Sequence, residues 1–452
     1  MSEATAIRVS TAAAPRRAPL PSSAGNRMAW LDALRGLAAL AVVYVHFADY
    51  ALPGLRDVVA GWFDFGRYGV LLFFAVSGYV IPMSLERHGS LRRFWVGRVF
   101  RLYPAYLLAA GSMLALGATG IHPISGMLRN EPLTGLLAHA TMTTGLTGIS
   151  GLAGVFWTLA YEMIFYVLVA ALFALGLHRR SGWLALGLAG TALIIGDGLP
   201  QAVLGGTDGR RLVTAVVMTA LLAVSVLGYV SGRRRLVLGC AVAGLGVLAF
   251  PLLNGGATSG QAGWQATSFL AIMLAGTTAY RMQHRLTNRR RGALVITGVL
   301  LCVIAAGLVN GHSLAQRRTW VIVILAVAAS FGLGFLARRL PVPGWMLWLG
   351  KVSYSLYLLH QVLLYVARHY VPDLGQRSLA VQVLGAGVYF AVLFTWVAWA
   401  YRLVERPGQE VGRRVARALD QRWGSDKRVP SIRRPAQRPP VDRRVTGTPV
   451  PR

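Results

Sequence analysis

Charged residues are scarce in this sequence, which excludes an ordinary soluble protein. Only 14% of the 452 residues are charged and 55% are hydrophobic, whereas a soluble domain usually has about 25% charged residues. The mean hydropathy is +0.53. Runs of about 20 mostly apolar residues, each enough to cross a bilayer core, recur along the chain with only short basic joints between them. We therefore predict a polytopic integral membrane protein.

Acidic residues are scarcer than basic ones. The chain has 16 Asp and Glu against 46 Lys and Arg, a formal net charge of +30. In a soluble domain this excess would indicate nucleic acid binding. Here the basic residues lie in the joints and in the two tails, where they orient the helices and contact anionic membrane lipids. No nucleic-acid-binding module is visible, so we expect lipid contacts and no nucleic acid partner.

Cysteine is nearly absent, and this argues against a metal centre. Cys240 and Cys302 lie in separate apolar runs and lack metal-ligand spacing. We interpret both as packing residues and expect no metal ion.

The apolar runs predict an all-α transmembrane helix bundle. Asp197, Gly198 and Pro200 interrupt the region of the fifth and sixth runs, so we predict ten to twelve spans. The runs cover residues 31–51, 66–86, 99–119, 152–177, 182–200, 211–230, 234–253, 263–281, 292–310, 319–338, 346–369 and 378–402.

The basic joints predict the orientation of the helices. Lys and Arg favour the cytoplasmic side of a membrane, and alternate joints carry them, with Arg210 and Arg211 as the main exception. This pattern places both termini in the cytoplasm.

Two tails flank the predicted membrane domain of residues 29–407. Residues 1–28 are rich in Ala, Ser, Pro and Arg and lack the features of a classical signal peptide, which predicts a disordered, basic cytoplasmic tail. Residues 408–452 begin with an amphipathic stretch around Val411–Trp423 and then become Pro/Arg-rich, which predicts a surface helix followed by disorder. Neither tail is long enough for a second folded domain.

The first span carries ionisable residues that a bilayer disfavours. Arg35 and His46 are separated by about three turns of helix, or about 16 Å of rise, and so lie on one face. Arg35 is near the cytoplasmic mouth and His46 is well inside, while Asp32 lies near the same face and can orient the guanidinium. Intramembrane ionisable residues indicate a functional site. Taken alone, His46 is equally consistent with a core histidine, and Arg35 with a cytoplasmic anchor.

Two further spans place ionisable side chains at a depth similar to that of His46. Glu162 follows Tyr161 in the fourth span, and His360 follows the Ser353–Leu359 stretch in the eleventh. One carboxylate and two histidines at similar depth predict a buried acid/base group. Separate structural hydrogen bonds remain the alternative interpretation.

The cytoplasmic mouth carries two more arginines. Arg98 and Arg101 are one helical turn apart, on the same side of the membrane as Arg35. Arginine binds phosphate in a bidentate manner, although topological anchoring explains each residue alone. Together, the residues describe a phosphate-binding mouth leading to a buried histidine. A long donor with a phosphate head and a thioester tail, such as acyl-coenzyme A (acyl-CoA), would span that path.

These segments, in this order, resemble the acyltransferase-3 family of integral membrane O-acyltransferases from about Leu31 to Pro407. Any one segment is weak evidence, but five or six in order are specific. The matching segments are Arg35 with His46, Phe73–Gly78, Arg98–Pro104, Trp157–Tyr166, Ser353–His360 and Glu405–Pro407.

The resemblance implies transfer of an acyl group, often acetyl, from acyl-CoA to a hydroxyl of a carbohydrate or natural product. It makes His46 the catalytic histidine and assigns the matching arginines to the acyl-CoA end. Family members usually have ten core helices, and some carry a C-terminal hydrolase-like domain. This chain continues instead into a basic tail, so we expect it to act alone or with a separate partner.

These observations give each residue an expected role. Arg35, Arg98 and Arg101 would hold the donor phosphates, and His46 would act as general base or acyl carrier, oriented by Glu162. Acyl-CoA enters as a co-substrate, and no bound cofactor is expected. The residues expected to line or support the cavity are Asp32, Ser77, Trp157, Tyr161, Tyr354 and His360.

A proton-coupled transporter or flippase, acting on a small molecule or lipid-linked sugar, is the alternative function. It explains the number of helices, with the buried His and Glu relaying protons. It leaves the arginine cluster unexplained, and the two halves show no internal repeat. A membrane sensor has less support. The Arg/Ala/Gly-rich composition fits a high-GC bacterium, where an acyltransferase in the inner (cytoplasmic) membrane would modify a glycan, a glycolipid or a secondary metabolite.

Overall fold

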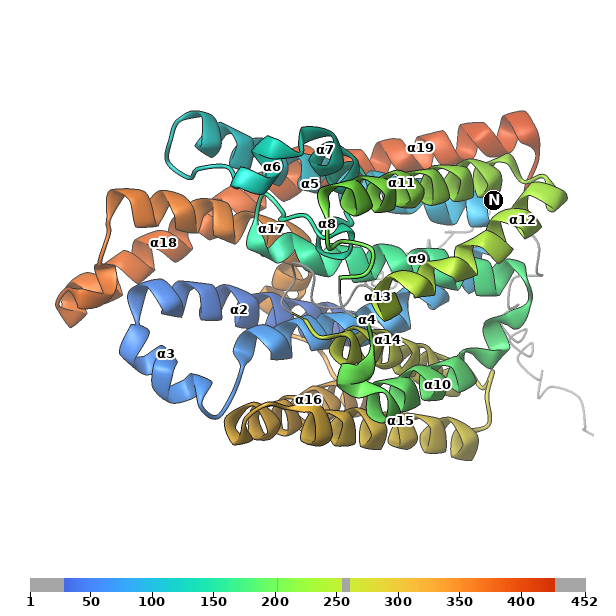
Figure 1. Cartoon of the computed structure of the whole chain (residues 1–452), viewed down its shortest axis with the longest axis horizontal. Helices are drawn as coiled ribbons and strands as arrows, with labels where there is room; N and C mark the ends of the chain where they lie inside the picture. Colours follow the sequence, from blue (N-terminus) through green and yellow to red (C-terminus); the bar gives the residue numbers. More distant parts are fainter. Residues whose placement is uncertain (1–27, 201, 254–260, 427–452) are drawn as a thin grey trace, which may run out of the picture.

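The computed structural model describes residues 28–200, 202–253 and 261–426, and these ranges form helices joined by turns and loops, without strands (Figure 1). The predicted N-terminal tail of residues 1–28 lies outside them except for Met28. The last part of the predicted C-terminal tail, residues 427–452, also lies outside the described residues.

Twelve helices correspond to the twelve predicted apolar runs. They are α2 (Ala29–Ala51), α4 (Phe65–His88), α5 (Leu91–Ala118), α9 (Trp157–Ala174), α10 (Ser181–Ile194), α11 (Asp208–Ser231), α12 (Arg234–Leu245), α14 (Gly263–Gln283), α15 (Arg289–Asn310), α16 (Leu314–Leu336), α17 (Gly344–Tyr370) and α18 (Leu379–Ala400).

Nine helical segments within the described ranges are long and apolar enough to cross a membrane. They include α2, α4, α5 and α11, whereas α10 is only 14 residues long. The prediction of an all-α transmembrane bundle is confirmed. The cytoplasmic location of the termini remains a prediction.

Short helices occupy the connections. They are α3 (Pro53–Ala60), α6 (Gly126–Asn130), α7 (Pro132–Ala140), α8 (Thr144–Thr147), α13 (Ala249–Leu253), and the 3-10 segments η1 (Gly154–Phe156), η2 (Leu177–Arg180), η3 (Gly196–Gly198), η4 (Gly246–Leu248) and η5 (Leu374–Gln376). The turns between α9 and α10, between α11 and α12, and between α14 and α15 lie at one end of the bundle (Figure 1). These joints are among the arginine-rich ones that predicted a common side of the membrane.

A tight turn joins α4 to α5. Gly89 ends α4 with a positive φ of 63°, a conformation that glycine adopts without steric cost. Ser90 then begins α5 because its hydroxyl accepts a hydrogen bond from the Arg93 backbone N–H at 3.0 Å. The turn brings the end of α4 beside the arginines at the start of α5.

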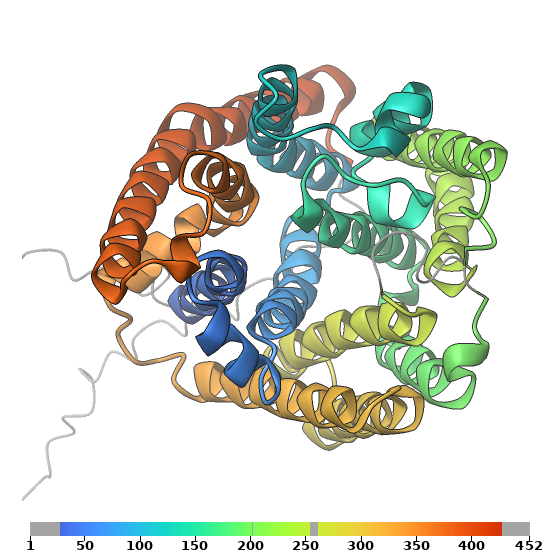
Figure 2. The same ribbon diagram turned by 60° about the vertical axis from the view of Figure 1, so that its left-hand side comes forward.

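Helix α2 lies against α4 and α17, as Figure 2 shows for α2 (dark blue) and α4 (lighter blue). The backbones of α2 and α17 approach closely at Gly350, where a Cβ atom would lie 2.1 Å from the carbonyl oxygen of Asp32. Helices α4 and α14 cross in the same way at Gly78 and Gly276. Small residues permit such close helix packing in membranes, and here the packing brings the polar faces of α2, α4 and α17 together.

A C-terminal helix, α19 (Arg406–Trp423), contains the predicted amphipathic stretch. It continues from α18 through one π-helical segment, η6 (Tyr401–Glu405). Helix α19 packs against the first half of α5, where a Cβ on Gly408 would lie 2.6 Å from the Pro104 ring and one on Gly412 would lie 2.5 Å from Phe100 Cβ. The predicted surface helix is therefore fixed to the bundle.

Candidate active site

A polar cavity lies between α2, α4, α5, α9 and α17, with about 570 Å³ of empty space. Five of the predicted site residues line it, one from each of these helices: Arg35, Ser77, Arg101, Glu162 and Tyr354. The other lining residues are Val70, Phe73, Phe74, Leu102, Thr158, Leu159 and Tyr357. The sequence pattern did not single out Thr158 and Tyr357, whose hydroxyls share a hydrogen bond of 2.8 Å.

Opposite charges balance one another in this cavity. Arg35 faces the like charge of Arg101 and the opposite charges of Asp32, Glu162 and Glu405. The Tyr166 hydroxyl donates a short hydrogen bond to the Glu162 carboxylate. Arginine and carboxylate groups that converge in this way stabilise one another's charge in a low-dielectric site.

Glu405 belongs to this charge cluster, although the sequence pattern predicted no role for it. It is buried in η6, accepts a hydrogen bond from the Ser355 hydroxyl at 2.8 Å and interacts with Arg35 and Arg101. The signal was present in the sequence as a lone carboxylate at the C-terminal end of the last span.

Arg98 lies beside the cavity rather than in its wall. Its buried guanidinium stacks over the rings of Tyr166, at 5.2 Å, and Phe94, at 5.3 Å. Tyr166 therefore connects Arg98 with Glu162, since its ring lies under the cation and its hydroxyl bonds the carboxylate.

His46 forms a pair with His360. The two rings stack with centroids 5.4 Å apart and planes at 28°. Nδ1 of His360 lies 3.3 Å from the Leu356 carbonyl, and its buried Nε2 has no hydrogen-bond partner within the described ranges. A carbonyl only accepts, so a neutral His360 that bonds it carries its proton on Nδ1, which leaves Nε2 with a free lone pair.

His46 and Glu162, which we expected to pair, do not pair with each other within the described residues. In the described ranges, the hydrogen bond of Glu162 comes from Tyr166, and no hydrogen bond or ion pair joins it to His46. Arg35 lies about 9 Å along α2 from its start and His46 about 26 Å. Glu162 lines the cavity with Arg35, whereas His46 lies further along α2 and contacts α17.

Tyr357 connects the cavity with the histidine pair. It lines the cavity, its ring lies 6.1 Å from the ring of His360, and its hydroxyl donates to the Val155 carbonyl at 3.0 Å. Cavity, Tyr357, His360 and His46 thus follow one another along α17 and α2.

Two predicted lining residues pack in the aromatic core instead. Tyr161 is buried against Phe74 and Phe269, with centroids 5.9 and 5.4 Å apart. Trp157 meets Tyr161 edge-on at 5.8 Å. Neither residue lines the cavity. Asp32 is also outside the wall and interacts with Arg35, Arg101 and Lys351.

A second, larger hollow lies next to the cavity. We call it the basic hollow. It has about 1160 Å³ of empty space between α4, α5 and α19 and is lined by Ser84, His88, Arg93, Phe94, Gly97, Arg98, Arg101, Gln409, Gly412, Arg413, Ala416 and Arg417. Arg101 lines both the basic hollow and the cavity. The three predicted phosphate-binding arginines therefore lie around these two adjoining spaces.

Apolar helices surround a buried, charged cavity in this protein. This arrangement is that of a multi-pass membrane protein with an internal polar site. The chain belongs to the acyltransferase-3 family, because the family model described as an acyltransferase domain matches residues 28–209 and 211–402.

Curated relatives agree with this family. The chain is 32% identical to Nodulation protein 10 of Rhizobium leguminosarum bv. viciae over 37% of this chain and 50% of that protein. It is 28% identical to Acyltransferase MdmB of Streptomyces mycarofaciens over 40% and 47% of the two chains. It is 23% identical to the Putative peptidoglycan O-acetyltransferase YrhL of Bacillus subtilis (strain 168) over 83% and 54%.

The chain spans about half the length of the curated relatives it matches. No solved structure matches it significantly.

Proposed function

We propose that this protein is a membrane O-acyltransferase that moves an acyl group from acyl-CoA to a hydroxyl acceptor, with acetyl as the expected acyl group. The observation that carries the proposal is that one residue, Arg101, lines both the basic hollow and the charged cavity. Tyr357, in the wall of the cavity, lies 6.1 Å from the ring of His360, which stacks on His46. Family membership supports the same chemistry.

The donor binds with its phosphates at the arginines and its thioester further in. Arg35, Arg98 and Arg101 provide guanidinium groups that suit bidentate phosphate contacts. The distance along α2 between Arg35 and His46, about 16 Å, fits an extended thiol arm better than a compact ligand.

His46 performs the chemistry. As general base, it accepts the proton of the acceptor hydroxyl while the oxygen bonds to the thioester carbonyl carbon. The carbon–sulfur bond then breaks, and His46 returns the proton to the leaving thiolate. In the covalent route, a nitrogen of His46 bonds to the thioester carbonyl carbon, the carbon–sulfur bond breaks and coenzyme A leaves as the thiolate. The acceptor oxygen then bonds to the same carbon, the carbon–nitrogen bond to His46 breaks, and the hydroxyl proton passes to the thiolate.

His360 assists His46 in either route. Its ring stacks on that of His46, and its Nε2 has no hydrogen-bond partner among the described residues. Glu162 keeps a role at the donor end, where it balances Arg35 and Arg98.

The acceptor is a hydroxyl of a glycan, a glycolipid or a secondary metabolite, and the location is the bacterial cytoplasmic membrane. The names of two relatives support acyl transfer, and one of them supports a glycan acceptor. One is called an acyltransferase and the other a putative peptidoglycan O-acetyltransferase.

Coenzyme A release by the purified, detergent-solubilised chain tests the proposal. Acetyl-CoA would be supplied with and without panels of candidate acceptors, for wild type, His46→Ala and Arg35→Ala. His369→Ala provides a matched control, because His369 is an exposed histidine near the end of α17. We expect His46→Ala to abolish turnover, Arg35→Ala to raise KM for acetyl-CoA, and the control to match wild type. Turnover by a correctly folded His46→Ala protein at the wild-type rate would refute the proposed chemistry.

A further inference from the structure

One wall of the basic hollow is formed by α19, and the proposed function assigns no role to its residues. Five arginines line it, and no carboxylate is among its lining residues. Two of the five, Arg413 and Arg417, come from α19, outside the membrane-spanning helices that carry Arg98 and Arg101. A space of this charge and size is unsuited to an apolar ligand and suited to a polyanion.

The two α19 arginines lie one helical turn apart on the same face. Arg413 has 64% of its side chain exposed, and its nearest carboxylate oxygen, on Glu410, is 3.9 Å away. The Nε of Arg417 donates to the Arg413 carbonyl at 3.3 Å. Both guanidinium groups keep most of their donors available for a ligand.

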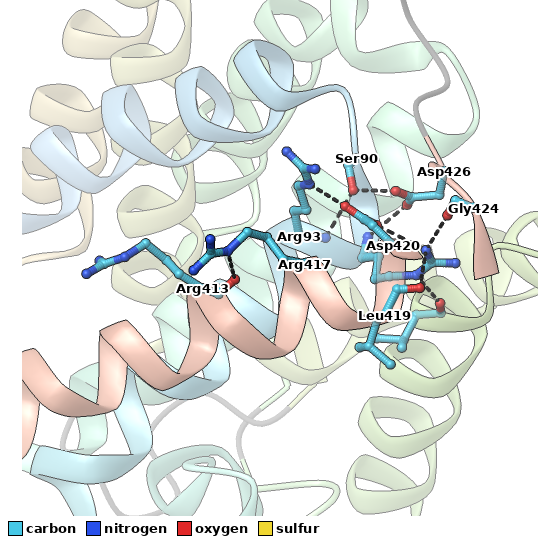
Figure 3. Close-up of polar contacts among 10 residues, drawn as sticks. Ser90, Arg93, Arg413, Arg417, Leu419, Asp420, Gly424 and Asp426 are labelled. Atoms are coloured by element: carbon cyan, nitrogen blue, oxygen red, sulfur yellow. Dashed lines mark hydrogen bonds and ion pairs between the residues drawn. The ribbon is translucent and has the colours of Figure 1, made fainter. Parts of the chain in front are cut away.

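Arg92 and Arg93, by contrast, are committed to holding α19 in place. Figure 3 shows the contact of Arg93 with Asp420. Arg93 pairs with Asp420 at 2.6 Å, and buried Arg92 bonds Asp420 at 3.1 Å and the Gly424 carbonyl at 2.7 Å. The backbone N–H of Arg92 and the hydroxyl of Ser90 both donate to Asp426.

This clamp fixes the position of Arg413 and Arg417 opposite α5. A binding wall that is already ordered loses little conformational entropy when a ligand arrives. The polar residues of α19 therefore form two groups. Asp420 anchors the helix to α5, whereas Arg413 and Arg417 remain available to a ligand.

We propose that Arg413 and Arg417 form the second wall of the donor site and bind the phosphate groups of the nucleotide end of acyl-CoA. This rests on the proposed function. The larger hollow receives the bulky nucleotide, and the arm enters the smaller cavity past Arg101, which borders both spaces. Anionic lipid headgroups carry the same phosphate chemistry, so the test must separate the two sources.

Direct binding of coenzyme A to the full chain in nanodiscs of phosphatidylcholine, a lipid without net charge, tests the inference. The double variant Arg413→Gln/Arg417→Gln removes the wall and keeps good helix formers. Its matched control is Arg414→Gln/Arg422→Gln, which removes the same charge from exposed positions of α19 that do not line the hollow. Pantetheine, which lacks the nucleotide and its phosphates, is the second probe.

We expect the double variant to weaken coenzyme A binding by about tenfold or more, as the loss of charge-assisted hydrogen bonds predicts. The control should bind coenzyme A like wild type, and pantetheine should bind equally to all three proteins. Equal coenzyme A affinity in the double variant and the control would overturn the inference. A loss seen only in nanodiscs containing phosphatidylglycerol would also overturn it, because the arginines would then serve lipid headgroups.

Failure of the proposed function gives a different result. In that case wild type itself would show no coenzyme A binding and no acetyl-CoA turnover, whatever residues stand at 413 and 417.

Discussion

At the scale of single residues, the buried Nε2 of His360 lowers the stability of the folded protein. A buried polar atom without a hydrogen bond costs about 1–3 kcal/mol, and Nε2 of His360 has no partner among the residues that the structure describes. Such a cost is typical of a functional position, since replacing the ring by an apolar one of similar shape would remove it. Its ring stacks on that of His46, the residue that we propose performs the chemistry.

His360→Phe should therefore separate activity from stability. The phenyl ring can keep the stacking on His46 but has no lone pair, so we expect kcat to fall by about tenfold or more with little change in KM for acetyl-CoA. The melting temperature should stay the same or rise, because the unpaired atom is gone. Unchanged kcat in a stable His360→Phe protein would show that His360 is only a packing residue.

The sequence predicts the members of the site better than their pairing. The sequence predicted Arg35 and Arg101 at the donor mouth and Glu162 beside His46, and the family resemblance added Ser77 and Tyr354 as lining residues. All five line one cavity. The partner of His46 was not predictable, because depth along a helix does not fix how each helix is rotated about its axis. Glu162 and His360 both satisfied the depth argument for His46, and only packing distinguishes them.

At the scale of helices, the crossing of α4 and α14 depends on two glycines. A Cβ on Gly78 would lie 1.9 Å from the Met273 carbonyl oxygen, and one on Gly276 would lie 2.3 Å from that of Ala75. The Thr277 hydroxyl donates to the Gly78 carbonyl at 2.9 Å across the same contact. The two backbones are therefore too close for any side chain between them.

Gly78→Ala should destabilise the bundle by about 1–3 kcal/mol, the usual range for overpacking. Gly111→Ala is the control, because a Cβ on this glycine of α5 meets nothing within 4 Å. Thermal unfolding in detergent should show a lower melting temperature for Gly78→Ala and an equal or slightly higher one for Gly111→Ala. Equal melting temperatures would mean that the two helices separate without cost.

His139 in the short helix α7 makes a second prediction at this scale. Its Nε2 accepts from the Leu152 N–H at 3.3 Å, and its Nδ1 lies 2.7 Å from the Tyr106 hydroxyl. Burial lowers the pKa of His139 to about 4, whereas an unfolded histidine has a pKa of about 6.5. The stability from neutral His139 is therefore complete above pH 6.5 and is lost as the pH falls towards 4.

At pH 5 this loss should reach about 2 kcal/mol. His139→Gln does not titrate in this range, so its melting temperature should fall less than that of wild type between pH 7 and pH 5. Parallel curves for the two proteins would contradict the assignment of a neutral, buried His139.

The helices themselves follow from the sequence, and their irregular parts do not. Hydrophobicity predicted each apolar run that became a helix, including α11, which was in doubt. It gave too long a span for α10, which ends at Ile194 before the Gly196–Gly198 segment. The π-helical segment η6 that carries Glu405 has no hydrophobic signature, since it depends on how α18 meets α5 and α19.

At the scale of the whole molecule, the clamp on Asp420 attaches α19 to the bundle. Arg92 has only 2% of its side chain exposed, and removal of one partner of a buried ion pair typically costs about 3–5 kcal/mol. Asp420→Asn should thus release α19 while leaving the buried helix α14 intact.

Hydrogen–deuterium exchange measures this release. We expect amides of α19 to exchange at least about 100-fold faster in Asp420→Asn, and those of α14 to exchange as in wild type. Glu410→Gln is the control on the same helix, because Glu410 pairs with exposed Arg406 at 3.2 Å, and such surface pairs contribute about 0–1 kcal/mol. Slow exchange throughout α19 in Asp420→Asn would show that its packing on α5 suffices to hold it.

The amphipathic pattern predicted α19 as a helix but not its place in the molecule. A charged, amphipathic sequence fits a lipid surface and a protein surface equally well. In the structure α19 lies on a protein surface. Gly408 and Gly412 contact α5, and Asp420 pairs with Arg92. These contacts join residues more than 300 positions apart, and no local pattern reports them.

Arg101 lines both the cavity and the basic hollow, and this position has a consequence for double-mutant cycles. Substitutions at independent sites add their free energies, whereas those that share a partner do not. An Arg101 variant perturbs the cavity and the basic hollow at once. Its effect will overlap with those of Arg35 on one side and of Arg413 on the other, while Arg35 and Arg413 line separate spaces. The coupling energies of these three pairs therefore map the connection between the two hollows.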